Sequence, residues 1–218
     1  MKKMFLLIFS LLFCSFFLIS CKNNQKIEEN ISEITKIYFY GENNDGDLKC
    51  SISVGQREDP YKVDGIHNPT CDFSLISLNS KVYQGEQIDV SIFLDDICYK
   101  LVLYFNPVSN VYINDLGFAI EGNDAVYIEV NGKNFNLYNL SNDFKIGYTD
   151  AINISVDKLQ NELSSLFDNG KFLGECYLKI LSNPNSDKLF WLFTVQTRHV
   201  DSINLIISID TGEIIMQN

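Results

Sequence analysis

The sequence is poor in the residues that carry most acid–base and metal chemistry. Among 218 residues it has two histidines, His67 and His199, and one tryptophan. Neither histidine stands in a recognisable nucleophile or zincin motif, and solvated side chains are the simpler interpretation. Lys and Arg number 17 against 28 Asp and Glu, a formal net charge of −11. Such a surface repels a polyanionic backbone, so the composition argues against nucleic acid as a partner.

Long apolar runs are missing after the first 20 residues. No later segment has 18 consecutive apolar residues, so we expect the remaining chain to fold in water. The start differs, because Met1-Lys2-Lys3 precedes residues 5–19, which are apolar apart from Ser10, Cys14 and Ser15. A basic start, a short apolar stretch and a small residue before a polar segment indicate a secretory signal peptide over residues 1–20.

The end of this segment carries a lipidation motif. Leu18-Ile19-Ser20-Cys21 resembles the lipobox of bacterial lipoproteins. The resemblance implies a diacylglycerol on the Cys21 thiol, cleavage before Cys21, and anchoring in the cell envelope through acyl chains such as palmitate. Lys22 after Cys21 favours the outer over the inner membrane, by resemblance to enterobacterial lipoproteins. A single membrane helix and an ordinary secretory signal are the alternatives.

The mature chain is more acidic than the whole sequence. Removal of residues 1–20 takes away Lys2 and Lys3, which leaves 15 basic and 28 acidic residues and a net charge of −13. Residues 22–33 are mostly polar, so Cys21 with this segment predicts a lipidated tether over residues 21–33. A helix over residues 27–34 is the alternative.

From residue 34 to 148 the sequence predicts an all-β sandwich domain, Ig-like or a small barrel. Apolar and polar residues alternate along about eight short segments, and no segment has convincing helical periodicity. Asp95-Asp96 predicts one hairpin turn, and Asn131-Gly132 predicts a type I′ turn. The predicted strands are 36–40, 49–54, 72–78, 88–94, 97–105, 115–121, 126–130 and a return strand through Phe135 and Leu137. Residues 81–87 weakly resemble strand entries of immunoglobulin-like envelope modules.

Residues 149–218 predict a helix followed by an antiparallel sheet, so that the whole chain is assigned to the α+β class. Ser155 is expected to cap a helix with an apolar stripe from Val156 to Phe167. The expected strands are 176–182, 189–197, 202–209 and 213–216. This order and the ending Ile207-Ser208-Ile209-Asp210-Thr211-Gly212-Glu213-Ile214-Ile215 resemble the PepSY and PepSY-like family. The chain departs from the family pattern in two ways. One residue fewer separates Asp210 from Gly212, and residues 183–187 predict a longer loop. The resemblance implies an extracytoplasmic binding or regulatory module and not a catalyst.

Four cysteines remain in the mature chain besides Cys21. In an exported protein this even number predicts disulfides among Cys50, Cys71, Cys98 and Cys176, with Cys50–Cys71 and Cys98–Cys176 as one pairing. Free buried thiols are the alternative. A zinc site formed by Cys50, His67, Cys71 and Cys98 would lack the usual paired Cys-x-x-Cys spacing. A catalytic Cys71–His67 dyad is suggested only by the short spacing of these two residues. We therefore predict no metal and no cofactor.

Two further patterns concern binding. The acidic run 42–47 departs from the spacing of an EF-hand, so a polar hairpin turn is preferred over a calcium site. Tyr38 and Tyr40, with Tyr104 and Tyr127, lie opposite the apolar stripes of their strands, where glycans could stack on exposed rings. Ordinary strand aromatics are the alternative.

The function predicted from the sequence is non-catalytic binding at the cell envelope. A protein partner is the first hypothesis, because the chain is acidic, anchored and poor in catalytic groups. Glycan or cell-wall binding through Tyr38 and Tyr40 is the second. A hydrolase is the third, and it requires His67 or His199 in a cleft beside a nucleophile.

Overall fold

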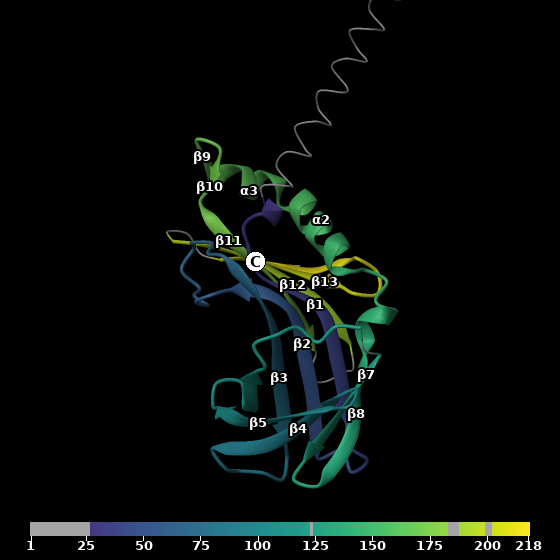
Figure 1. Ribbon diagram of the computed structural model, residues 1–218. Coiled ribbons are helices and arrows are strands. Elements are labelled where there is room, and N and C mark those ends of the chain that lie inside the picture. The colour runs from purple at the N-terminus through teal and green to yellow at the C-terminus, as the bar shows by residue number, and fades with distance from the viewer. Residues whose placement is uncertain (1–26, 123, 183–187, 199–201) are drawn as a thin grey trace, which may run out of the picture.

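The computed structural model describes residues 27–122, 124–182, 188–198 and 202–218 (Figure 1). Its main feature is one continuous sheet of 12 strands, in the order β14-β13-β12-β11-β1-β2-β3-β6-β5-β4-β7-β8. These strands are β1 (Ile31–Glu42), β2 (Leu48–Glu58), β3 (Thr70–Ser80), β4 (Gln87–Leu94), β5 (Ile97–Asn106), β6 (Val111–Asp115), β7 (Ala125–Val130), β8 (Lys133–Asn139), β11 (Gly174–Ser182), β12 (Leu189–Thr197), β13 (Ile203–Ser208) and β14 (Ile214–Gln217). Strands β9 (Phe167–Asp168) and β10 (Lys171–Phe172) form a separate hairpin.

The first eight strands close into an antiparallel barrel. Phe39 and Tyr40 on β1 pair with Asn139 and Tyr138 on β8, which joins the last strand of the row to the first. The turns follow the local sequence, because Asn131 and Gly132 both have positive φ, as a type I′ turn requires. Asp95 also has a positive φ at the turn between β4 and β5.

Strand β1 belongs to the barrel and to the rest of the sheet. Its beginning, from Ile31 to Ile34, pairs in parallel with β11, whereas its end pairs with β8. The register against β2 shifts between Thr35 and Ile37, and a Cβ on Gly55 would clash there with the carbonyl oxygen of Ile34. Strands β11–β14 therefore leave the barrel at β1 as an antiparallel extension.

Each part of the sheet has its own hydrophobic core. The barrel interior is filled by buried side chains such as Phe39, Ile52 and Leu103. The second core lies between the extension and the helices, and includes Trp191 and Phe193. Apolar side chains therefore fill the interior of the barrel.

The α-helices α2 (Tyr148–Lys158) and α3 (Gln160–Ser165) cover one face of the extension (Figure 1). The 3-10 helix η1 (Leu140–Asp143) lies against β1, where Ser141 Oγ accepts from the N–H of Tyr38. The prediction that Ser155 caps a helix is wrong. Ser155 lies inside α2, where its hydroxyl donates to the carbonyl of Ala151 at 2.7 Å. The start is set at Gly147, whose N–H donates to Asp150 Oδ2 at 3.2 Å.

The predicted fold class is wrong. The chain is mostly β, and in place of a sandwich followed by a helix-plus-sheet α+β domain, a closed barrel continues into the extension through β1. The alternating segments were correct for most strands, but the segment 115–121 was not. The observed strand β6 ends at Asp115 and lies before that segment. Alternation identifies strands but not their partners, so it could not reveal that β8 returns to β1.

The folded part begins earlier than the predicted tether allows. Ile27 is 1% exposed and packs in the second core, and β1 begins at Ile31. Residues 27–33 are therefore part of the fold, and only residues 22–26 separate it from Cys21. Cys21 itself and the predicted signal peptide lie outside the described residues. None of the described helices is long and apolar enough to cross a membrane.

Candidate functional site

A loop at the junction of barrel and extension is held by several buried polar groups. This junction loop, residues 59–69, connects β2 to β3 and makes hydrogen bonds to the extension through three of its residues. The N–H of Gly65 donates to Glu175 Oε1 at 2.8 Å. The hydroxyl of Tyr177 donates to the carbonyl of Lys62 at 3.2 Å, and Lys179 Nζ donates to the Tyr61 hydroxyl at 2.8 Å.

A buried carboxylate holds the two ends of this loop together. Glu58 is 1% exposed at the end of β2. Its Oε1 accepts from the N–H of Lys62, and its Oε2 accepts from the backbone and side chain of Asn68. These bonds replace the solvation that the carboxylate loses on burial, and they fix the shape of the loop.

A second buried carboxylate orients His67. Glu175 and Ser32 are both fully buried, and Ser32 Oγ donates to Glu175 Oε2 at 3.1 Å. His67 Nδ1 lies 3.3 Å from the same Ser32 oxygen. Because the serine hydrogen points to Glu175, the oxygen accepts from Nδ1–H. In the neutral ring Nε2 is then left as an acceptor.

This chain of groups differs from a catalytic triad. In a triad the histidine lies between the serine and the carboxylate and removes the serine proton. Here Ser32 lies between His67 and Glu175, is fully buried, and donates its hydrogen bond to the carboxylate. The arrangement therefore orients an imidazole and does not activate a serine.

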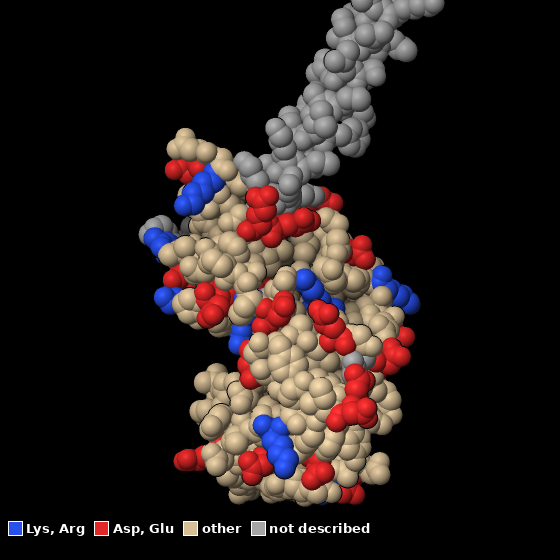
Figure 2. All heavy atoms as spheres, in the orientation of Figure 1, with Lys and Arg blue, Asp and Glu red and all other residues tan. Residues whose placement is uncertain are grey.

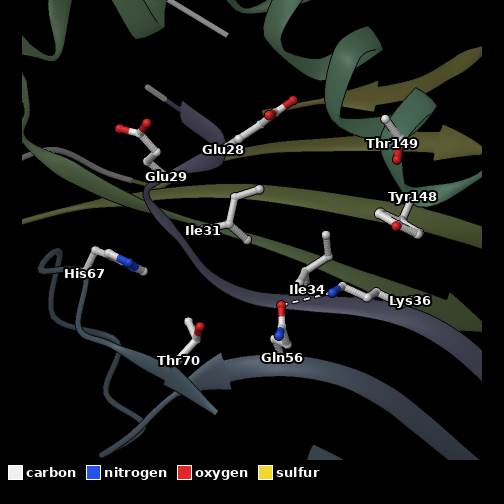
Figure 3. A pocket seen from close by; sticks show the side chains of 10 residues that line it. All are labelled: Glu28, Glu29, Ile31, Ile34, Lys36, Gln56, His67, Thr70, Tyr148 and Thr149. Atoms are coloured by element: carbon white, nitrogen blue, oxygen red, sulfur yellow. Dashed lines mark hydrogen bonds between the residues drawn. The ribbon is translucent and has the colours of Figure 1, made fainter. Parts of the chain in front are cut away.

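A cleft of about 420 Å³ opens beside His67 (Figure 3). We call it the junction cleft. Its lining residues come from the beginning of the described chain, β1, β2, the junction loop, β3 and α2: Glu28, Glu29, Ile31, Ile34, Lys36, Gln56, His67, Thr70, Tyr148 and Thr149. Lys36 and the pair Glu28 and Glu29 lie on different sides of the apolar Ile31 and Ile34 (Figure 3). The cleft thus has a basic and an acidic end.

An ion pair lies on β1 and β11 close to the junction loop. Lys179 Nζ is 2.9 Å from a carboxylate oxygen of Glu33, which is 6% exposed. Burial lowers the pKa of Lys179, but Glu33 and the Tyr61 hydroxyl outweigh this effect and raise it. Burial, with Glu175 nearby, raises the pKa of Tyr177, so its hydroxyl stays protonated and can donate to Lys62.

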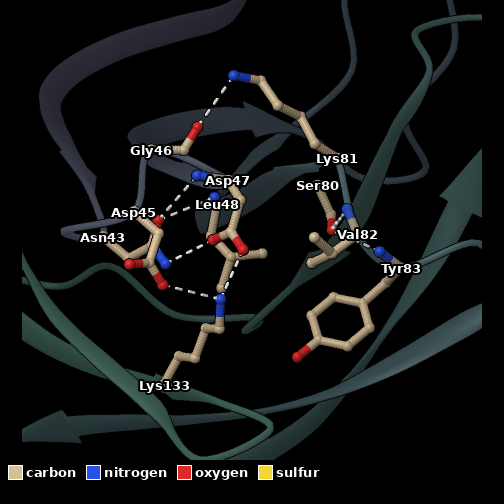
Figure 4. A network of polar contacts seen from close by, with 10 residues as sticks. All are labelled: Asn43, Asp45, Gly46, Asp47, Leu48, Ser80, Lys81, Val82, Tyr83 and Lys133. Carbon is tan, nitrogen blue, oxygen red and sulfur yellow. Dashed lines mark hydrogen bonds and ion pairs between the residues drawn. The ribbon is translucent and has the colours of Figure 1, made fainter.

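The opposite end of the barrel is formed by the turns 43–47, 107–110 and 131–132 and the loop 81–86, which we call the distal rim. Asn43 Oδ1 accepts from the N–H groups of Asp47 and Leu48, and Lys133 Nζ lies 3.2 Å from Asp45 and 2.5 Å from Asp47 (Figure 4). The Lys133 ammonium lowers the pKa of Asp47. The acidic run 42–47 is therefore a hairpin turn neutralised by lysine, as the preferred interpretation predicted.

A groove of about 290 Å³ lies at the rim. It is lined by hydroxyl, amide, aromatic and lysine side chains and by a glycine: Ser80, Lys81, Tyr83, Gln84, Gly85, Phe105, Asn110 and Tyr112. The rings of Phe105 and Tyr112 are 5.3 Å apart, and the Tyr112 hydroxyl donates to the Gly85 carbonyl at 2.8 Å. None of these lining residues is acidic, although the chain as a whole is. We call this the rim groove.

Of the four tyrosines considered for stacking on a glycan, Tyr104 and Tyr127 are exposed, but Tyr38 and Tyr40, the predicted binding residues, are not. Tyr38 is 6% exposed, burial raises its pKa, and its N–H donates to Ser141 Oγ at 2.7 Å. Tyr40 is half-buried on the same strand. The Tyr38 ring therefore offers no open face for stacking on a sugar, and the Tyr40 ring is only partly open.

The four cysteines of the fold are free thiols in the structure. Cys50 and Cys176 are buried, one in each core, whereas Cys71 and Cys98 are exposed. Cys50 lies on β2, whereas Cys71 lies on β3 opposite Arg57 of β2. Cys50 and the position opposite Cys71 are therefore seven residues apart along β2. That is about 23 Å along a strand, too far for a disulfide. Within the described residues, no three His, Cys, Asp or Glu side chains are placed to hold a metal ion.

This placement predicts two reactive and two protected thiols. Burial raises the pKa of Cys50 and Cys176, which suppresses their thiolates as well as their access to reagent. With a chromogenic disulfide reagent and native mature protein, we expect two thiols to react quickly and two only in denaturant. Cys71→Ser should remove one fast thiol and Cys50→Ser none. Fewer than two fast thiols in the native protein would contradict the prediction.

Sequence reasoning named His67 but missed the groups that orient it. Ser32 and Glu175 are 143 residues apart and meet because β1 pairs with β11. His199 lies outside the described residues. The only signal for Glu175 in the sequence was its position as a charged residue at the start of an apolar strand. Its partner Ser32 could not be found without knowing that β1 pairs with β11.

No protein-family model, no curated protein and no solved structure matches the chain.

Proposed function

We propose that this protein is a lipid-anchored, non-catalytic binding protein of the bacterial cell envelope that engages an envelope protein through its distal rim. The anchor rests on the lipobox resemblance at Cys21. Only five residues lie between that cysteine and Ile27, which packs in the second core. The extension and its helices are therefore held next to the membrane, within about 21 Å of the acylated residue.

One observation carries the binding role, namely that apolar side chains are exposed at the end of the barrel farthest from the anchor. Strand β1 has 12 residues and runs from the anchored end to the rim, about 36 Å. At the rim Val82 is 50%, Phe105 39% and Val108 95% exposed. Exposed apolar groups with polar neighbours are typical of protein interaction sites.

A saccharide is the second candidate ligand, and the rim groove favours it. Tyr83 and Phe105 offer ring faces, while Gln84 and Asn110 offer amide donors and acceptors for sugar hydroxyls. This groove replaces Tyr38 and Tyr40 as the place where a glycan would bind.

Crosslinking in intact source cells, followed by mass spectrometry, tests the proposal. We expect a dominant envelope protein to be captured by the native lipoprotein. The double variant Val82→Asp/Val108→Asp should reduce the captured amount at least tenfold, because a buried unpaired carboxylate is costly at an interface. Val63→Asp, at another exposed valine on the junction loop, is the matched control and should leave capture unchanged.

Three results would count against the proposal in different ways. Equal capture by the rim variant and the control would exclude the rim as the binding surface. Retention of the protein on envelope polysaccharide, without a protein partner, would replace the partner by a glycan. Membrane retention and acyl labelling of Cys21→Ala equal to those of the native protein would overturn the anchor.

A further inference from the structure

We propose that the junction cleft binds a short peptide with a free amino group and a free carboxylate. This site is separate from the distal rim and does not depend on the proposed partner there. The cleft has opposite charges at its two ends and an apolar surface between them.

Lys36 provides the basic end. Its ammonium donates to Gln56 Oε1 at 2.9 Å, and Gln56 Nε2 in turn donates to Asp72 Oδ1 at 3.2 Å. Within the described part of the chain Lys36 makes no ion pair with a carboxylate, despite the excess of acidic residues. The cation is thus positioned by a neutral amide and keeps its charge available for a carboxylate ligand.

Glu28, Glu29 and His67 provide the acidic end. Both glutamates line the cleft and make no ion pair among the described residues. The bond from Nδ1–H of His67 to Ser32, which is backed by Glu175, leaves Nε2 as an acceptor. Two carboxylates and an imidazole acceptor suit an ammonium group, which has three N–H donors.

The surface between the ends fits a peptide better than a single amino acid. Ile31 and Ile34 of β1 contribute apolar surface, and the hydroxyls of Thr70, Tyr148 and Thr149 and the amide of Gln56 offer polar contacts on the walls. Between Glu29 and Lys36 the backbone covers at most about 23 Å, and an extended peptide of three residues spans roughly 10 Å. The Lys36 ammonium is held at Gln56, whereas the exposed side chains of Glu28 and Glu29 can turn inward to close part of the difference. The volume of about 420 Å³ is within the range of small-ligand sites, roughly 300–1,000 Å³.

Calorimetric titration of the purified mature lipoprotein in detergent tests this proposal with alanyl-leucyl-alanine as the probe. We expect amidation of its carboxylate and acetylation of its amine each to weaken binding about tenfold, because each removes a charge-assisted contact. Lys36→Met should lower the affinity for the unmodified peptide to the affinity that the native protein has for the amidated peptide. In this variant the two peptides should then bind equally well. Glu28→Gln/Glu29→Gln should likewise abolish the difference in affinity between the unmodified and the acetylated peptide.

Matched variants separate a local from a general charge effect. Lys49→Met removes a lysine of β2 that pairs with Glu42, and Glu86→Gln/Glu121→Gln removes two exposed carboxylates outside the cleft. Both should leave the affinity and the effect of each end group unchanged. Failure of the native protein to bind the probe at millimolar concentration, or equal binding of the three peptide forms, would overturn the proposal.

Discussion

Replacing Trp191 by alanine should lower the free energy of unfolding by about 3–5 kcal/mol, the range for loss of a large buried aromatic side chain. Trp191 is fully buried on β12 in the second core, with the Phe144 ring 5.8 Å away in an edge-to-face arrangement. Its Nε1–H donates to the Ile146 carbonyl at 2.8 Å. The variant leaves a cavity between the sheet and the segment before α2, and it leaves that carbonyl without its donor.

Urea denaturation followed by far-ultraviolet circular dichroism measures this effect, because the variant removes the chain's one tryptophan and with it the fluorescence signal. Trp191→Phe is the control. It retains most of the ring volume and loses the hydrogen bond, so we expect a smaller loss of about 1–2 kcal/mol. A loss below 1 kcal/mol for Trp191→Ala would show that the second core does not hold the extension.

The strands could be predicted from the sequence because local patterns determine them. In β4, Ile88, Val90 and Ile92 are buried and alternate with polar or half-buried residues, as period-two patterning requires. Asn131 and Gly132 specify their turn through positive φ values that few other residues adopt.

The sequence left a small barrel open beside a sandwich but could not decide for barrel closure, because closure depends on contacts between distant segments. Phe39 pairs with Asn139, 100 residues later, and Ile31 pairs with Cys176. Both partners lie on strands whose alternation would serve equally well in two separate sheets. The strands before and after the predicted boundary near residue 148 therefore belong to one continuous sheet, joined where β1 pairs with β11.

The candidate site shows the same limit on a smaller scale. His67 attracted attention as one of only two histidines, but its role depends on Ser32 and Glu175, which reach it from β1 and β11. In the sequence, Lys36 belongs to a predicted strand and Glu29 to the predicted tether, and nothing distinguishes either residue from its neighbours. Their position at two ends of one cleft follows from where the tether ends and β1 begins.

The second large effect is expected at Glu175. Glu175→Ala removes the acceptor of both the Gly65 N–H and the Ser32 hydroxyl, in a place where neither can reach water. Because a hydrogen bond to a charged group contributes about 1.5–3 kcal/mol and an orphaned buried donor adds a penalty, we expect a total loss of about 2–4 kcal/mol. Amide hydrogen exchange at Gly65 should become faster, since that bond fixes the junction loop to β11.

A double-variant cycle distinguishes this mechanism from the loss of side-chain volume. Ser32→Ala/Glu175→Ala removes one orphaned donor together with its acceptor, so its destabilisation should be smaller than the sum of the two single effects. Glu175→Gln keeps a carbonyl oxygen for Gly65 and should slow its exchange again relative to the alanine variant. If the single effects add and Gly65 exchange does not change, the carboxylate does not hold the loop. The orientation of His67 at the cleft would then have to depend on the fold of residues 59–69 themselves, and above all on Glu58, which accepts hydrogen bonds from both ends of that loop.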